Sequence, residues 1–113
     1  MGYYVVVSEQ GPGWHPGRSM REQEGWGAHA TFMNALADER LVLLGGPLKG
    51  AAHHRALLVT QAPSEPALRD RLAQDPWMVS GVLRVVSVEP WELLLGELEA
   101  PAPELPGGTR PPV

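Results

Sequence analysis

The segment at residues 41–61, LVLLGGPLKGAAHHRALLVTQ, decides the fold of this chain. Its two apolar runs, Leu41–Leu44 and Arg55–Gln61, are rich in Leu and Val and predict strands. Gly45-Gly46-Pro47 ends the first run, and the connection around Gly50 is short, so we expect the two strands to form an antiparallel hairpin.

On the N-terminal side of the hairpin, the sequence predicts a strand and then a helix. Tyr3–Ser8 is a β-branched and aromatic run that is apolar on both faces, which indicates a central strand. A loop rich in Gly and Pro follows from Gln10 to Gly17. From about Met20 to Ala37, apolar residues recur every three or four positions, as in an amphipathic helix. Gly25 and Gly27 weaken its first half by about 1 kcal/mol each relative to Ala, so we expect the regular helix to start late.

On the C-terminal side, the sequence predicts a shorter helix and a last strand. Ser64 is a plausible N-cap for a helix that runs to about Ala73. Asp75-Pro76-Trp77 closes that helix, because proline disfavours the helical conformation in the residue before it. Gly81–Val88 is the predicted fourth strand, which Trp91–Leu95 extends after Pro90.

The resulting order is β-α-β-β-α-β, which predicts an α+β, ferredoxin-like domain over residues 1–96. Its four-stranded antiparallel sheet would carry both helices on one face. The other face is also apolar and needs a cover, for which a second subunit is the obvious source, so we expect a homodimer built as a dimeric α+β barrel. Residues 97–113 are rich in Pro and Gly and predict a flexible tail.

Composition excludes several classes of function. The net charge of −4, with basic residues scattered along the chain, argues against nucleic-acid binding. The chain has no cysteine, which excludes disulfides, thiolate catalysis and a cysteine-based zinc site. No apolar run approaches the roughly 20 residues that span a bilayer. Met1–Tyr4 lacks the basic start of a signal peptide, so we expect a cytoplasmic protein that does not bind membranes.

The candidate catalytic residues are His29, on the inward face of the first helix, and Asp75, in the turn before the last strand. A carboxylate beside an imidazole selects the tautomer of the ring and strengthens it as a base, which suits general acid–base catalysis. Two structural interpretations stay open at this point. A lone inward histidine is more often part of the core, and an aspartate before proline commonly initiates a turn.

Aromatic and glycine residues suggest walls for a ligand pocket near this pair. Trp14, Trp26 and Trp77 could line a site for a planar ligand, or they could anchor loops and an interface. Gly46 and Pro47 end a strand, where glycine lets a ligand approach the backbone or only shapes a turn. Adjacent His53 and His54 point to opposite faces, so they do not suit one metal ion, and we expect them to be solvated turn residues. No role is predicted for His15.

Six motifs give the chain a family resemblance. They are Gly11-Pro12-Gly13-Trp14, Arg21-Glu22-Gln23, Trp26-x-x-His29-Ala30-x-Phe32-Met33, Leu44-Gly45-Gly46-Pro47-Leu48, Asp75-Pro76-Trp77 and Val88-Glu89-Pro90-Trp91. In this order and spacing they resemble the YciI-like (YCII-related) family from about Tyr3 to Leu95. The resemblance implies the dimeric α+β barrel and an active site built on a histidine and an aspartate, which map to His29 and Asp75. Most members of this family have no assigned reaction. One relative is a dehydrochlorinase that acts on a chlorinated hydroxyquinol, an activity that does not transfer automatically to this chain.

Together these observations predict a homodimeric enzyme, a lyase or isomerase, that needs no metal and no organic cofactor. His29 would act as the general base or acid and Asp75 would orient it, in an elimination or isomerisation of a small cyclic or aromatic substrate. The predicted substrate-binding residues are Trp14, Trp26, Phe32, Gly46, Pro47 and Trp77. The alternative is a non-catalytic module that binds a small molecule or serves as an accessory protein-interaction domain.

Overall fold

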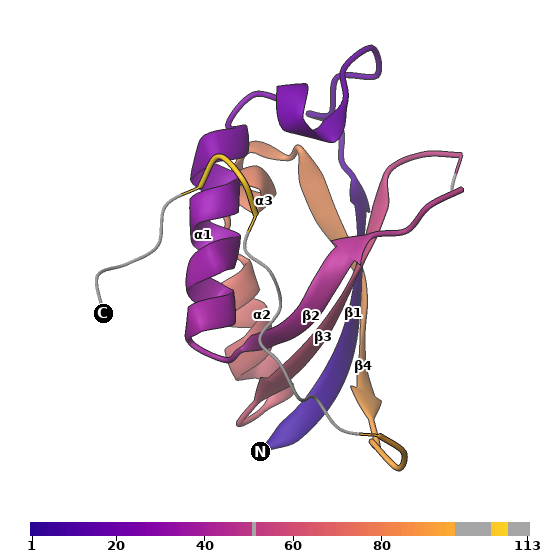
Figure 1. The fold of residues 1–113 in the computed structure, drawn as a ribbon, viewed down its shortest axis with the longest axis vertical. Coiled ribbons are helices and arrows are strands. Elements are labelled where there is room, and N and C mark those ends of the chain that lie inside the picture. Colours follow the sequence, from indigo (N-terminus) through magenta and orange to yellow (C-terminus); the bar gives the residue numbers. More distant parts are fainter. Residues whose placement is uncertain (51, 97–104, 109–113) are drawn as a thin grey trace.

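In the part of the chain that the computed structural model describes, residues 1–50, 52–96 and 105–108, four strands form one antiparallel sheet in the order β2-β3-β1-β4. Figure 1 shows the helices packed on one face of this sheet, with the other face uncovered. This arrangement confirms the ferredoxin-like α+β fold, including the β2–β3 hairpin and the central position of β1. In chain order the elements are β1 (Gly2–Gln10), the 3-10 turn η1 (Met20–Glu22), α1 (Trp26–Asp38), β2 (Val42–Pro47), β3 (Arg55–Ala62), α2 (Glu65–Leu72), α3 (Pro76–Ser80) and β4 (Leu83–Trp91).

The main core lies between the sheet and the helices. Side chains alternate along a strand, and the even-numbered residues of β1 and β3 face the helices. Val6 and Leu58 are buried there against Leu36 of α1 and Leu68 of α2. Each such burial contributes about 1.5–3 kcal/mol relative to leaving the side chain exposed.

The late start expected for the first helix is confirmed, because the regular helix begins at Trp26, after a 3-10 turn, and Gly25 takes the left-handed conformation with φ 83°. Other element boundaries differ from the sequence-based expectation. Strand β2 includes Gly45, Gly46 and Pro47, and proline is tolerated in it because β2 is an edge strand. The Asp75–Trp77 segment follows the end of α2, as expected, but it also begins α3, a short helix that the sequence pattern does not predict.

The Gly- and Pro-rich loop after β1 is held against the rest of the molecule. The N–H of Gly11 donates to the carbonyl of Val82 at 2.8 Å, and a Cβ at Gly11 would lie 2.2 Å from the carbonyl oxygen of Gly81. The buried side chain of Gln23 accepts from the N–H of His15 at 2.8 Å and donates to the carbonyls of His15 and Arg18. These contacts fix the loop that carries Trp14.

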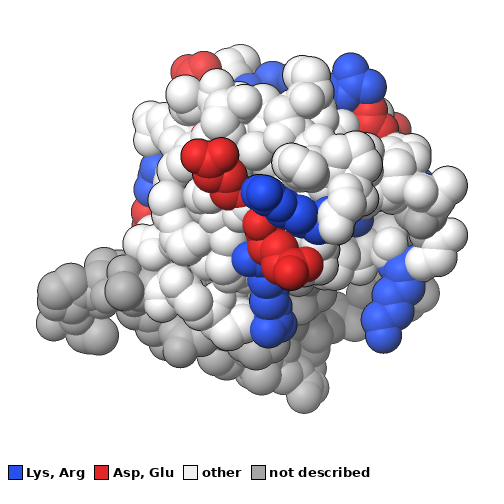
Figure 2. Space-filling model, turned by 90° about the horizontal axis from the view of Figure 1, so that it is seen from above, with Lys and Arg blue, Asp and Glu red and all other residues white. Residues whose placement is uncertain are grey.

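Charged side chains of both signs are interspersed on the surface. Figure 2 shows Lys and Arg beside Asp and Glu on one face of the molecule, without an extended region of one sign. Surface ion pairs join Arg69 to Glu65 at 2.9 Å and Arg71 to Glu39 at 2.6 Å. None of the described helices is long and apolar enough to cross a membrane.

Candidate active site

His29 lies in the first turn of α1 and points toward the sheet. Its N–H donates to the carbonyl of Gly25 at 3.0 Å, the residue that starts the helix. Gly25 takes a positive φ of 83°, which glycine adopts without strain, so the chain can turn into α1 at this point. Only 7% of His29 is exposed, which confirms its predicted inward position.

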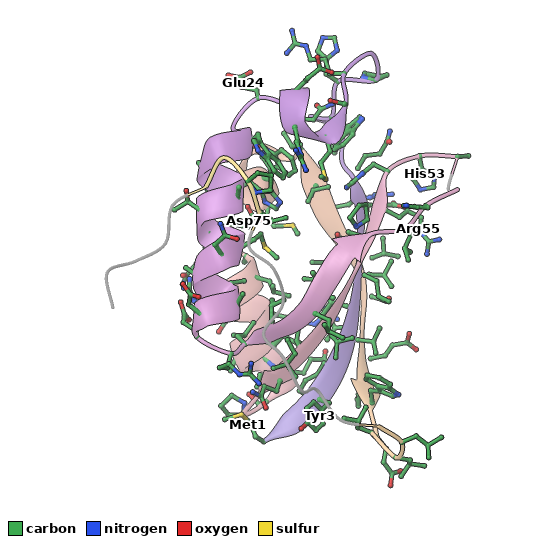
Figure 3. All side chains as sticks on the ribbon, viewed as in Figure 1. Met1, Tyr3, Glu24, His53, Arg55 and Asp75 are labelled. Carbon is green, nitrogen blue, oxygen red and sulfur yellow. The ribbon has the colours of Figure 1, made fainter. Side chains whose placement is uncertain are left out.

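Asp75 is brought to His29 by the start of α3. Both carboxylate oxygens approach Nδ1 of His29, at 2.9 Å and 2.8 Å, although the two residues are 46 positions apart. The oxygen Oδ1 also accepts the N–H of Trp77 at 2.9 Å, so Asp75 is the N-cap of α3. Asp75 is buried in the layer between helices and sheet (Figure 3). The residue is therefore both the partner of His29 and the turn-initiating aspartate of the structural interpretation.

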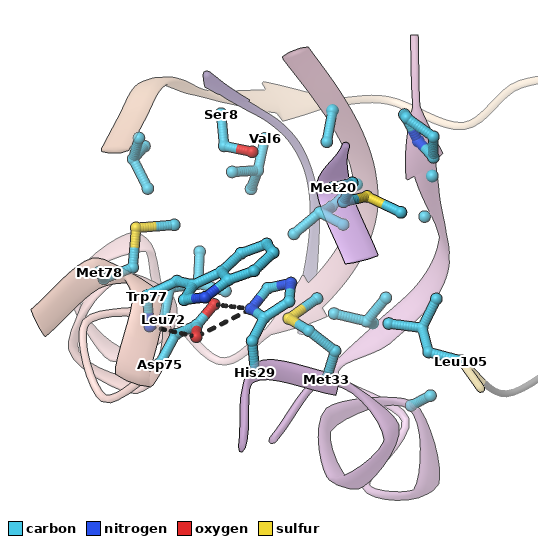
Figure 4. A pocket seen from close by; sticks show the side chains of 18 of the residues that line it. Val6, Ser8, Met20, His29, Met33, Leu72, Asp75, Trp77, Met78 and Leu105 are labelled. Atoms are coloured by element: carbon cyan, nitrogen blue, oxygen red, sulfur yellow. Dashed lines mark hydrogen bonds and ion pairs between the residues drawn. The ribbon is translucent and has the colours of Figure 1, made fainter. Parts of the chain in front are cut away.

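The carboxylate selects the tautomer of His29. An ionised carboxylate only accepts hydrogen bonds, so Nδ1 of the imidazole carries the proton and Nε2 is left with a free lone pair. Figure 4 shows the ring with Nδ1 turned to Asp75 and the other nitrogen directed away from it, into the cavity. This is the arrangement of a general base that is held by a second residue.

Trp77 fixes the plane of the imidazole. The two rings stack with centroids 3.9 Å apart and an interplanar angle of 11°. The indole N–H of Trp77 donates to the carbonyl of Glu24 at 2.8 Å, and Trp77 is 1% exposed. Trp26 packs beside both rings, with its centroid 5.8 Å from His29 and 5.6 Å from Trp77. The imidazole therefore has little freedom to rotate out of its contact with Asp75.

The free nitrogen of His29 faces a cavity of about 110 Å³ between the helices and the sheet. Engineered apolar cavities of about 150 Å³ bind benzene, so this space is on the scale of one six-membered ring. Its walls are largely apolar, with methionines prominent among them. Side chains that line it include Val6, Met20, Met33, Leu58, Met78 and Val85.

The structure places the six predicted substrate-binding residues in two groups. Trp26, Gly46, Pro47 and Trp77 line the cavity. Two do not. Phe32 packs against the main core, where the guanidinium of Arg71 lies 4.9 Å from its ring. Trp14 lies behind the wall of the cavity, where its edge approaches Trp77 at 6.3 Å.

The two adjacent histidines have different surroundings. Figure 3 shows His53 at the end of the β2–β3 hairpin, away from the helices; it is paired with Glu9 at 3.1 Å, as expected for a solvated residue. Hydrogen bonds from Arg84 and His53 lower the pKa of Glu9 from its ordinary value. His54 differs from the expectation, because it lines the cavity and stacks on Trp14 at 4.5 Å.

The described part of the C-terminal region closes one side of the cavity. Residues 105–108 lie along α1 (Figure 1), and Leu105 lines the cavity. The buried side chain of Asn34 pairs with the backbone of Leu105, accepting its N–H at 2.7 Å and donating to its carbonyl at 3.0 Å. The indole of Trp26 donates to the carbonyl of Pro106 at 3.2 Å. Most of the tail that was predicted to be flexible, residues 97–104 and 109–113, lies outside the described residues.

Fold and site together define an α+β domain that holds a buried histidine–aspartate pair at an apolar cavity. The sequence matches no family model, and no curated protein matches it. Among solved structures the chain is similar to a 5-chloro-2-hydroxyhydroquinone dehydrochlorinase from Burkholderia phenoliruptrix AC1100, in complex with 2,5-dihydroxybenzoquinone. The TM-score is 0.53 at 17% sequence identity, and the match covers 82% of this chain and 95% of that chain. At this identity the likeness shows the α+β fold alone.

Proposed function

We propose that this protein is an enzyme that uses His29 as a general base, oriented by Asp75, on a small cyclic or aromatic substrate. The observation that carries the proposal is the buried pair itself. Nδ1 of His29 is held at 2.8 Å by Asp75 while Nε2 faces an apolar cavity that fits one ring. A structural core histidine would need no such cavity at its second nitrogen.

The chemistry that suits this geometry is proton abstraction followed by elimination or isomerisation. Nε2 takes a proton from a C–H or O–H group of the substrate, and the negative Asp75 stabilises the imidazolium that forms. The electron pair released from the broken bond moves into the substrate. In an elimination, the pair expels a leaving group from a neighbouring carbon. In an isomerisation, it forms a new C–H bond at a second carbon of the ring, with the proton that the His29 imidazolium gives back.

A hydroxylated six-membered ring is the substrate class that we propose. The cavity volume of about 110 Å³ suits one ring, and Trp26 and Trp77 are among the residues that line it beside the base. The structural neighbour acts on a chlorinated hydroxyhydroquinone, which is a ring of this kind. Membership of the YciI-like family and a cytoplasmic location are parts of the same proposal, supported by the six motifs and by the cysteine-free sequence.

We further propose that the active form is a homodimer built through the uncovered face of the sheet. The odd-numbered residues of β1 and β3 point to that face, among them Val5, Val7, Leu57 and Val59. Val86 of β4 is 52% exposed and Leu44 of β2 is 42% exposed. An apolar sheet face of this extent is typical of an interaction surface. A second copy would cover it by packing its own sheet face to face.

Sedimentation velocity on the purified protein tests the dimer. We expect a dimer for the wild type and a monomer for Val59→Lys, because a buried charge on each sheet would oppose the contact. Val79→Lys is the matched control, since Val79 is 77% exposed on α3, away from this face. A wild-type monomer at micromolar concentration contradicts the dimer.

The enzymatic proposal is tested with 5-chloro-2-hydroxyhydroquinone as substrate and 2,5-dihydroxybenzoquinone as a bound probe. We expect chloride release by the wild type and its loss, by a factor of about 10²–10⁴, in His29→Asn. The asparagine amide can still donate to Asp75 in place of Nδ1, so the fold is kept while Nε2 is removed. Binding of the probe without turnover of the substrate would favour the non-catalytic binding module. A wild type that neither binds nor reacts contradicts the proposed substrate class.

A further inference from the structure

His54 lies on the wall of the same cavity as His29, directly before β3. Its N–H donates to the side-chain oxygen of Gln10 at 2.9 Å, and its carbonyl accepts the N–H of Gln10 at 3.0 Å. Its ring stacks on Trp14 with centroids 4.5 Å apart and an interplanar angle of 14°. Backbone and ring are therefore both held, and the orientation of the imidazole is set before any ligand arrives.

The ring nitrogens of His54 are available to a ligand. Among the described residues, neither nitrogen makes a hydrogen bond or an ion pair, in contrast to His29, whose Nδ1 is taken by Asp75. Burial lowers the pKa of His54 from its ordinary value, and electrostatic repulsion from the neighbouring histidines, His29 and His53, lowers it further. At neutral pH His54 is thus an uncharged imidazole that offers one N–H donor and one acceptor.

The two histidines differ in the task that each can perform. His29, backed by a carboxylate, suits proton uptake. His54 has no carboxylate partner among the described residues and stacks on an indole, so it suits hydrogen bonding to a neutral or partly negative oxygen. The rest of the wall is mainly apolar, so an oxygen substituent placed there would otherwise have few polar partners.

We propose that His54 is a second residue of this cavity that contacts the ligand. The ligand is ring-shaped: His54 forms a hydrogen bond to an oxygen at one end of the ring, and the other end of the ring meets Nε2 of His29. The site then selects rings that carry hydroxyl or carbonyl oxygens at two separated positions over rings that carry one. When His29 removes a proton, the electron pair that moves through the ring is received at the oxygen held by His54. This inference rests on the proposed function, because it assigns a specificity residue to the same site.

Calorimetric titration with two probes tests the inference. The first probe, 2,5-dihydroxybenzoquinone, has oxygens on opposite sides of its ring, and the second, phenol, has a single oxygen. We expect His54→Phe to weaken binding of the first probe about tenfold, the effect of one lost hydrogen bond, and to change phenol binding by less than about twofold. Phenylalanine keeps a ring against Trp14, so the wall is preserved.

Two further variants make the test specific. His54→Gln retains an N–H donor and is expected to recover part of the lost affinity. His53→Phe is the matched control, because His53 lies outside the cavity in a pair with Glu9, and it is expected to bind both probes as the wild type does. If the wild type binds the first probe, His29→Asn weakens that binding and His54→Phe leaves it unchanged, the role of His54 is overturned and the proposed function is not. A wild type that binds neither probe overturns the proposed function together with this inference.

Discussion

Asp75→Asn separates the two roles of Asp75, because the amide can replace the carboxylate as a helix cap but not as the partner of His29. The N–H of Trp77 lies 2.9 Å from Oδ1 of Asp75, so the amide oxygen of the asparagine must take that place. The amide nitrogen then occupies the place of Oδ2, which is 2.8 Å from Nδ1 of His29. An N–H donor facing Nδ1 favours the tautomer in which the ring proton sits on Nε2.

The expected cost in stability is small and the expected cost in catalysis is large. Asn and Asp are equivalent N-caps, so the start of α3 is kept. The bond to His29 changes from charge-assisted to neutral, which lowers the unfolding free energy by about 1 kcal/mol. Asp75→Ala instead removes the cap and leaves a buried N–H of His29 without its partner, at a combined cost of about 2–4 kcal/mol. With Nε2 protonated, His29 is no longer a base, and we expect kcat to fall by a factor of about 10²–10⁴.

Three measurements on wild type, Asp75→Asn and Asp75→Ala check this reasoning. Urea denaturation gives the unfolding free energies, chloride release from 5-chloro-2-hydroxyhydroquinone gives kcat, and ¹⁵N chemical shifts of the His29 ring report which nitrogen carries the proton. We expect Nδ1–H in the wild type and Nε2–H in Asp75→Asn. Two outcomes for Asp75→Asn would refute the assignment of His29 as a base oriented by Asp75. In the first, the variant keeps the wild-type tautomer of His29. In the second, the tautomer is reversed but the rate stays that of the wild type.

Three further outcomes follow from other parts of the structure. Gly11→Ala should lower the unfolding free energy measured by urea denaturation by about 1–3 kcal/mol, because the added Cβ would lie 2.2 Å from a backbone oxygen. Gly17→Ala has open space around it and should change the unfolding free energy by less than about 0.5 kcal/mol. Equal effects of the two substitutions would contradict the close approach at Gly11. Burial and two neighbouring histidines lower the pKa of His54, so the unfolded chain binds a proton at this residue more readily than the folded chain does. The unfolding free energy should therefore fall as the pH drops below 6.5, and it should fall less in His54→Gln. Identical pH profiles of the two proteins would contradict the lowered pKa of His54. Asn34→Ala should speed hydrogen exchange at the N–H of Leu105 while the main core stays protected, and unchanged protection of Leu105 would mean that other contacts hold this segment.

Local patterns account for the part of the structure that was predictable. The order of strands and helices follows from apolar periodicity, and the hairpin at residues 41–61 follows from two Leu- and Val-rich runs joined by a short connection. The inward position of His29 follows from the helical spacing with which Trp26, Ala30 and Met33 recur around it. The choice of Asp75 as its partner needed the family resemblance as well, because a contact between residues 46 positions apart leaves no local signal.

The details of the cavity wall were less predictable, because they depend on small rotations and on loop conformation. Met33 follows His29 by four positions and Phe32 by three, so they lie about 40° and 60° from it on opposite sides of the helix. Met33 lines the cavity and Phe32 enters the core, and periodicity alone does not choose between them. The place of Trp14 and His54 depends on the loop after β1 and the hairpin connection, whose shapes no repeating pattern encodes.

The start of α3 explains why fold and site are difficult to separate in this protein. Pro76 suits the first turn of a helix because it has no N–H to satisfy, and Asp75 caps that helix, so the pair gives the chain a sharp new beginning after α2. The same turn directs the carboxylate of Asp75 to His29 and places the ring of Trp77 on the imidazole. A substitution in Asp75-Pro76-Trp77 will therefore change stability and chemistry together, unless it keeps the cap as asparagine does. This is why a matched pair of variants at Asp75 is more informative about the mechanism than the removal of any single side chain.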